Sequence, residues 1–140
     1  MRYLKSLLAA VVVALAAVAI TPAVAGETDP LFVNVTTAEP HRAKMALMFA
    51  TNQLARKHPA TIFLNDKAVA LGSKKNAKRF AAHQKILADF VKAGGTVIAC
   101  PLCMAHYKVA EGDLVDGVKV GNPELTGSLL FKDNTKTLSW

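Results

Sequence analysis

Cysteine and the large aromatic residues are scarce in this chain of 140 residues, which has two Cys, one Trp and two Tyr. So few cysteines exclude a small scaffold held together by several disulfides. No apolar run reaches the roughly 20 residues that a membrane-spanning helix needs. Acidic residues are scarce as well, since 10 Asp and Glu stand against 17 Lys and Arg and leave a formal net charge of +7. Hydrophobic residues make up 52% of the chain, which is too many for an intrinsically disordered protein.

Residues 1–25 differ in composition from the rest of the chain. Two basic residues lead into an apolar run from Leu7 to Ile20, and small residues two apart follow at Ala23 and Ala25. This three-part order is typical of a secretory signal peptide. No cysteine lies near the predicted cleavage point, which argues against a lipoprotein anchor. We therefore expect residues 1–25 to be removed and one domain, residues 26–140, to reach the bacterial periplasm without stable membrane insertion.

The surplus of basic residues does not by itself indicate a nucleic-acid partner. Apart from Lys74-Lys75 and Lys78-Arg79, the basic residues beyond position 25 are scattered along the chain. A short run of this kind is more often the solvated start of a helix than a binding patch. We predict no nucleic-acid binding.

Beyond residue 25, strand-like and helix-like stretches alternate. Short β-branched runs predict strands, and longer stretches with apolar residues three or four apart predict helices. The predicted strands are 31–36, 61–64, 96–99, 118–120 and 137–140, and the predicted helices are 41–57, 77–93, about 101–109 and 123–131. Such alternation implies right-handed crossovers and parallel strands. The predicted fold is a three-layer α/β/α sandwich around a mostly parallel sheet of about five strands.

The apolar spacing also predicts which helix faces are buried. Met45, Met48 and Phe49 recur at helical spacing and are expected in the core. In the second helix, the expected buried stripe passes through Gln84 and leaves His83 exposed.

Both cysteines fall in one Cys-x-x-C motif directly after the third predicted strand. A disulfide between Cys100 and Cys103 would close a very short loop, so it would be a poor structural staple. Pro101 favours the first position of a helix, which predicts Cys100 at the N-cap. There the backbone N–H groups and the helix dipole favour the thiolate over the thiol. We predict Cys100 as the nucleophile and Cys103 as the partner that resolves a mixed disulfide or shares a sulfur atom.

Other interpretations of the motif remain open. The cysteines could simply pack or oxidise, or they could serve a thiol–disulfide oxidoreductase. Soft ligands at Cys100, Cys103, Met104 and His106 would suit Cu(I) or zinc, although the second Cys-x-x-C of a structural zinc site is absent. His41 starts the first helix at the same edge of the predicted sheet and is a further candidate for lining the site. We predict no other cofactor.

Four segments of the chain carry a resemblance to a known family. They are the strand exit Asn34–Thr37, the helix segment Met45–Ala50, the turn Phe63–Val69 and the stretch Gly95–Met104, which contains both cysteines. From about Leu31 to Trp140, the chain resembles the DsrE/DsrF-like family of sulfur-relay proteins.

The resemblance implies a DsrE-type fold and a sulfur carrier or sulfurtransferase that holds sulfur as a persulfide. It equates Cys100 with the sulfur-carrying cysteine and Cys103 with the extra cysteine of a two-cysteine subgroup. It also implies a homo-oligomer, trimer or hexamer, and sulfur donor or acceptor proteins as partners. The chain departs from the family at Tyr107-Lys108, where an Arg-Gly pair is common, and at Lys67, where glycine is usual. Because the chain carries an export signal, the cytoplasmic pathway of the family is not expected to carry over.

Overall fold

A computed structural model describes residues 26–140, so the predicted signal peptide lies outside the described residues. A sheet of five strands forms the centre, in the order β4-β3-β2-β1-β5, and all neighbouring strands are parallel. The strands are β1 (Leu31–Val35), β2 (Ala60–Leu64), β3 (Thr96–Ala99), β4 (Val118–Val120) and β5 (Lys136–Ser139). The helices are α2 (Pro40–Ala55), α3 (Ala77–Lys92), α4 (Pro101–His106) and α5 (Pro123–Leu130), with short 3-10 helices η1 (Asp66–Gly72), η2 (Lys74–Asn76) and η3 (Glu111–Asp113). The predicted α/β fold is confirmed.

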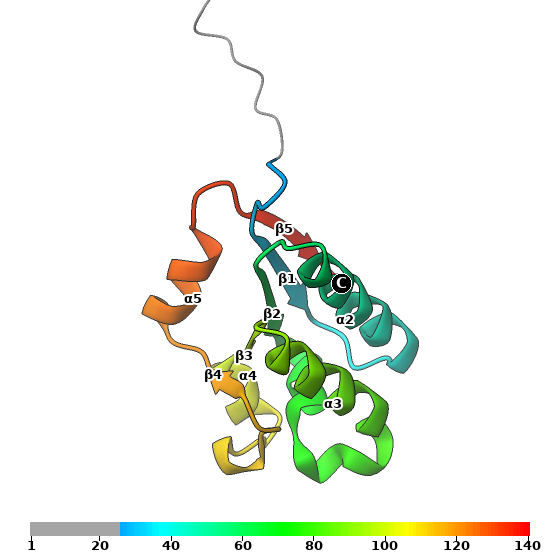
Figure 1. Cartoon of the computed structure of the whole chain (residues 1–140). Helices are drawn as coiled ribbons and strands as arrows, with labels where there is room; N and C mark the ends of the chain where they lie inside the picture. Colours follow the sequence, from blue (N-terminus) through cyan, green and yellow to red (C-terminus); the bar gives the residue numbers. More distant parts are fainter. Residues whose placement is uncertain (1–25) are drawn as a thin grey trace, which may run out of the picture.

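Helices α2 and α3 lie side by side on one face of the sheet (Figure 1). Beneath them, Val33, Ile62 and Val97 stand in register across β1, β2 and β3 and are fully buried. Burial of an aliphatic side chain of this size contributes about 1.5–3 kcal/mol. The main core of the molecule therefore lies between these two helices and the sheet.

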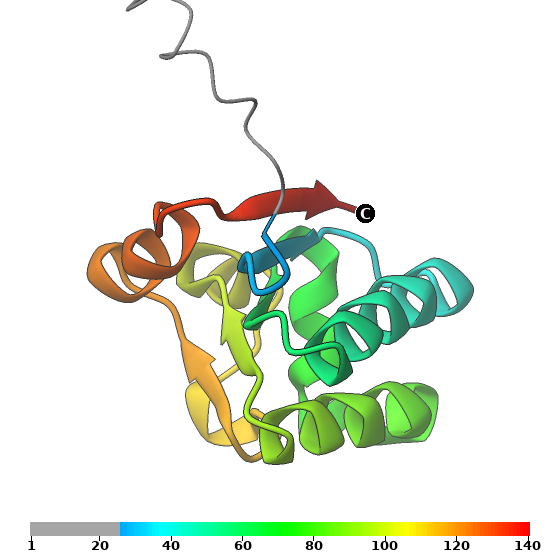
Figure 2. The same ribbon diagram turned by 45° about the horizontal axis from the view of Figure 1, so that its top comes forward.

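The opposite face of the sheet is covered by α5 (Figure 1). None of the residues of α5 is buried. Between α5 and the sheet lies an open hollow of about 480 Å³, lined by residues that include Phe32, Phe63 and Leu130. Beyond β1, strand β5 forms an open edge (Figure 2), and its side chains are exposed. The second face is therefore much more thinly covered than the first.

Two helix faces differ from the sequence prediction. On α2 the buried residues are Ala43, Ala46, Leu47 and Ala50, whereas Met45, Met48 and Phe49 are 38–39% exposed on the outer side. Three of the four buried residues are alanines, whereas Phe49 packs beside Trp140, with ring centroids 5.6 Å apart. On α3 the buried stripe passes through His83 instead of Gln84, and His83 is 6% exposed. Its Nε2 lies 2.8 Å from the carbonyl oxygen of Pro40, a partner on α2 that the sequence did not reveal.

The predicted element boundaries differ from the observed ones by a few residues. Two segments outside the predicted strands and helices form short 3-10 helices, η1 and η3. The basic pair before α3 is partly neutralised, because Lys74 pairs with Asp116 at 3.4 Å and Lys75 with Asp113 at 2.7 Å. Within residues 26–140, no helix is long and apolar enough to cross a bilayer.

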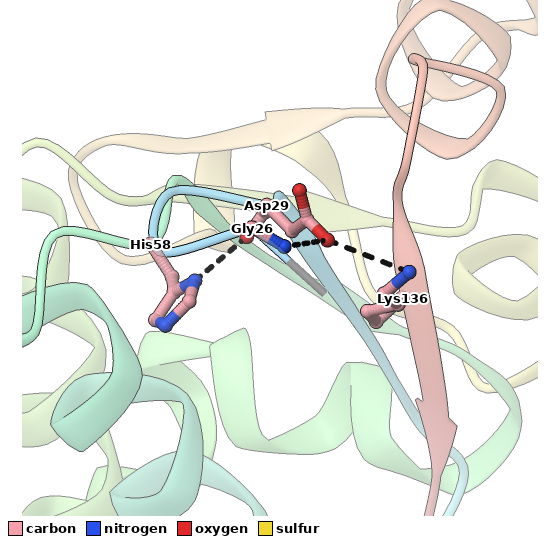
Figure 3. A network of polar contacts seen from close by, with 4 residues as sticks. All are labelled: Gly26, Asp29, His58 and Lys136. Carbon is pink, nitrogen blue, oxygen red and sulfur yellow. Dashed lines mark hydrogen bonds and ion pairs between the residues drawn. The ribbon is translucent and has the colours of Figure 1, made fainter. Parts of the chain in front are cut away.

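A polar network ties the amino ends of three strands together (Figure 3). Asp29 accepts a hydrogen bond from the backbone N–H of Gly26 at 2.9 Å and pairs with Lys136 of β5 at 3.4 Å. The carbonyl oxygen of Asp29 lies 2.9 Å from Nδ1 of His58, just before β2. This network lies at the edge of the sheet opposite to the cysteines.

Candidate functional site

Cys100 ends β3 and begins α4, at the carboxyl edge of the sheet. It is the N-cap of α4, and its Sγ accepts a hydrogen bond from the backbone N–H of Cys103 at 3.5 Å. Pro101 occupies the first position of the helix, where its missing N–H costs nothing. The predicted N-cap position of Cys100 therefore agrees with the observed geometry. Both cysteines are free and partly exposed.

Cys103 lies one turn into α4 and contacts the loop that follows β2. Its thiol donates a hydrogen bond to Oδ1 of Asn65 at 3.0 Å, and its Sγ accepts one from the backbone N–H of Asp66 at 3.2 Å. Burial raises the pKa of the Cys103 thiol, and Cys100 adds to that rise, whereas the N–H of Asp66 opposes it. Cys103 is therefore held as a protonated thiol at neutral pH.

Tyr107, directly after α4, contacts the same loop. Its hydroxyl donates a hydrogen bond to Oδ1 of Asp66. This bond raises the pKa of the Tyr107 hydroxyl, which stays protonated as the donor. Asp66 itself has a φ of +45°, in the left-handed region that Asp and Asn tolerate better than most residues. The side chain and the backbone of Asp66 are thus both used to connect η1 with α4.

The space beside Cys100 is small and apolar. A hollow of about 190 Å³ lies between the starts of α4 and α5, lined by residues that include Phe63, Cys100 and Leu102. The connections after β3 and β4 leave toward different faces, because Met104 of α4 packs with Ala99 and Val118 on the α3 side, whereas α5 covers the other face. In open α/β sheets, ligands bind at the carboxyl ends of strands where neighbouring connections diverge in this way. Cys100 lies at such a point.

The other candidate residues differ in how close they lie to the cysteines. Met104 is buried in an apolar cluster against which Cys100 and Cys103 pack, whereas His106 is exposed, with its ring edge-on to Tyr107 at 4.7 Å. The side chain of His41 is exposed, and its backbone N–H donates to the Glu39 carboxylate at 3.0 Å. Among the described residues, no group of three or more His, Cys, Asp or Glu side chains is placed to hold a metal ion.

The sequence interpretation did not identify Asn65, Asp66 and Tyr107 as parts of this site. A signal was present, because Asn65 and Asp66 directly follow β2, the neighbour of β3 in the sheet. Carboxyl ends of neighbouring parallel strands meet at one edge, so a polar pair after β2 lies close to Cys100 and Cys103. Tyr107 could not be placed without knowing where α4 ends.

A comparison with models of protein families identifies the family of this chain. The family model of the DsrE/DsrF-like family matches residues 31–134. The chain belongs to the DsrE/DsrF-like family. This family assignment agrees with the resemblance predicted from the sequence, and the matched span includes both cysteines and all of the α4 contacts described above.

Solved structures share the fold at low sequence identity. The ychN protein from E. coli is 17% identical with a TM-score of 0.65, over 81% of this chain and 99% of that chain. The conserved protein of unknown function BT1422 from Bacteroides thetaiotaomicron is 23% identical with a TM-score of 0.63, over 80% of this chain and 95% of that chain. The protein of unknown function MTH1491 from Methanobacterium thermoautotrophicum is 11% identical with a TM-score of 0.64, over 80% and 99%. Among curated proteins, none matches this sequence.

Proposed function

We propose that this DsrE/DsrF-like protein carries sulfur as a persulfide on Cys100, with Cys103 as the partner that releases it. The protein would act in the periplasm after removal of residues 1–25, as a carrier or sulfurtransferase between donor and acceptor proteins. Family membership and the export-type amino terminus support this role.

The observation that carries the proposal is the environment of Cys100. Its thiol is free, it lies where the connections after β3 and β4 diverge, and a hollow of about 190 Å³ opens beside it. The backbone N–H of Cys103 points at its Sγ and donates a hydrogen bond to it at 3.5 Å. A nucleophilic sulfur, an adjacent space and a fixed hydrogen-bond donor are what a sulfur-accepting site needs.

The loading chemistry requires only a sulfur donor. The Cys100 thiolate attacks a terminal sulfur of a polysulfide, and a new S–S bond forms at Cys100. The neighbouring S–S bond of the polysulfide breaks, and the chain shortened by one sulfur leaves with the electron pair. The product is a persulfide on Cys100, and no further oxidant takes part.

Intact mass spectrometry tests this proposal. Reduced protein incubated with polysulfide is expected to gain the mass of sulfur atoms, and dithiothreitol is expected to remove it. The Cys100→Ser variant should gain nothing, whereas Cys103→Ser should load and hold its sulfur longer than the parent. Loading that persists in Cys100→Ser and disappears in Cys103→Ser would reverse the two roles. A parent that never loads would reject sulfur carriage.

A thiol–disulfide redox protein is the second candidate function. The direct hydrogen bond between the N–H of Cys103 and Sγ of Cys100 favours it, because an adjacent thiol pair can close and open a disulfide. Insulin reduction separates the two functions. A redox protein accelerates insulin reduction by dithiothreitol, whereas a sulfur carrier does not.

A further inference from the structure

We propose that Asp66 and Tyr107 form a positioning pair that fixes the Cys103 thiol and sets the rate at which sulfur is released, without acting in loading. This inference rests on the proposed function and assigns a role to residues outside the Cys-x-x-C motif. Tyr107 also stands at a position where the chain departs from the family pattern.

The release step balances with the groups at the site. The Cys103 thiolate attacks Sγ of the Cys100 persulfide, and a Cys100–Cys103 disulfide forms as the bond to the outer sulfur breaks. The outer sulfur leaves with the electron pair and takes up the proton that Cys103 lost, so that hydrogen sulfide is released. Cys103 is oxidised and the outer sulfur is reduced. A thiol reductant must then reopen the disulfide before the next cycle.

This step depends on Cys103 losing its proton, and the surroundings oppose that loss. The titratable groups that act on the Cys103 thiol are Cys100, at the junction of β3 and α4, the Asp66 carboxylate in η1 and the Tyr107 hydroxyl after α4. Burial raises the pKa of Cys103 most, and Cys100 and the Asp66 carboxylate raise it further. The group that lowers it is the backbone N–H of Asp66, 3.2 Å from Sγ.

Tyr107 controls where that N–H points. Its hydroxyl holds the side chain of Asp66, whose backbone is in the left-handed region with φ +45°. A non-glycine residue keeps such a conformation only when its surroundings fix it. Asn65 adds a second restraint, because its Oδ1 accepts the backbone N–H of Asp66 at 2.9 Å as well as the thiol of Cys103. Without the Tyr107 hydroxyl, Asp66 loses its link to α4 and the hydrogen bond to Cys103 weakens.

The test compares Tyr107→Phe with two matched variants. Tyr107→Phe removes the hydroxyl alone and keeps the ring. Asp66→Asn keeps an oxygen that accepts the Tyr107 hydroxyl and tolerates the left-handed backbone, while it removes the charge that opposes ionisation of Cys103. Lys67→Ala changes an exposed neighbour without touching these hydrogen bonds. Loading by polysulfide is followed by intact mass, and release from loaded protein is followed as hydrogen sulfide in a single turnover across pH.

Tyr107→Phe is expected to load fully and to release sulfide about tenfold more slowly at pH 7. A tenfold change in rate corresponds to the loss of about one hydrogen bond to a charged group. Its release should speed up only at higher pH than in the parent. Asp66→Asn should release at least as fast as the parent, and Lys67→Ala should match the parent. A merely structural role for Tyr107 would not move the pH midpoint.

Several outcomes overturn the inference. If Tyr107→Phe releases sulfide at the rate and pH midpoint of the parent, the inference is wrong. It is also wrong if Tyr107→Phe loses loading in parallel with release, because Tyr107 would then act on Cys100 or on the whole fold. A parent that loads no sulfur rejects the proposed function but still leaves the positioning pair open to test. In that case the pH midpoint of Cys103 ionisation is measured by thiolate absorbance in Cys100→Ser and in the double variant that also carries Tyr107→Phe. A higher midpoint in the double variant supports the positioning pair, and an equal midpoint refutes it.

Discussion

The backbone N–H of Asp66 donates a 3.2 Å hydrogen bond to Sγ of Cys103, which joins the loop after β2 to the helix after β3 at a sulfur atom. The two residues are 37 positions apart in the chain. They meet because β2 and β3 are neighbouring parallel strands whose carboxyl ends lie at one edge of the sheet. The two cysteines therefore have different surroundings although they are one helical turn apart. Cys100 faces an apolar hollow, and Cys103 faces a polar loop.

The ionisation of Cys103 should differ from that of an ordinary cysteine. Burial raises its pKa, so we expect the thiolate absorbance of the Cys100→Ser variant to appear at higher pH in the folded protein than in urea. Removing Cys100 takes away one of the causes of the rise but leaves burial, the largest. A midpoint in the folded variant at or below that of the unfolded chain would contradict this expectation.

Gly121 lies at the end of β4, where the chain passes close to β3 and α5. A Cβ at this position would come within 2.9 Å of Cγ2 of Ile98 and 3.1 Å of Oγ1 of Thr126. We expect Gly121→Ala to lower the free energy of unfolding by about 1–3 kcal/mol, since overpacking a close contact displaces its neighbours. Because Gly121 also lines the hollow beside Cys100, loading should slow.

Gly112→Ala is the matched control for that substitution. A Cβ at Gly112 would meet nothing within 4 Å. Its urea unfolding curve should stay within about 0.5 kcal/mol of the parent. Equal stability of the two variants would show that the space around Gly121 is not tight.

Much of the fold could be predicted from the sequence because alternation of short apolar runs with helical spacing is a local signal. The motif Cys100-Pro101 also placed a helix start correctly, since proline at the first helical position is a local preference. The buried face of α2 could not be predicted in this way. Three of its four buried residues are alanines. Which face of α2 is buried depends on how the helix packs against the sheet, and the apolar spacing of the helix alone does not show this.

The polar half of the site was missed for a related reason, because the signal of Asn65 and Asp66 directly after β2 is informative only once β2 and β3 are known to be neighbours. The contact of Cys103 with Asn65 requires the strand order, and that order is a property of the whole chain. His83 was wrongly expected to be exposed because its partner, the carbonyl of Pro40, comes from a different helix.

We propose that the molecule self-associates through its thinly covered surfaces. Leu102 lines the hollow beside Cys100 and is 81% exposed, and Phe131 directly follows α5 and is 82% exposed. Large apolar side chains this exposed are candidates for contacts between copies of the chain. Light scattering should return a multiple of the chain mass at micromolar concentration. Phe131→Ser should lower that mass more than the neighbouring change Lys132→Ser, and a parent of one chain's mass would reject the proposal.

The hydrogen bond between Gly26 and Asp29 connects the predicted cleavage of the chain with the stability of the folded protein. Cleavage after Ala25 would turn the backbone N–H of Gly26 into a charged amino group, 2.9 Å from Oδ2 of Asp29, which also pairs with Lys136. Mass spectrometry of the exported protein should therefore find Gly26 as the first residue. In the cleaved protein, Asp29→Asn should lower the free energy of unfolding by about 1–2 kcal/mol, because it weakens hydrogen bonds to charged groups.

Asp133→Asn supplies the comparison for this substitution, since Asp133 is exposed. It should change the unfolding midpoint in urea very little. The Asp29 effect should also be larger in the cleaved protein than in a version that keeps one extra residue before Gly26, because an amide carries no charge to pair with Asp29. An equal effect in both versions would mean that Asp29 acts through Lys136 alone. Exported protein that still begins at Met1 would refute the cleavage itself.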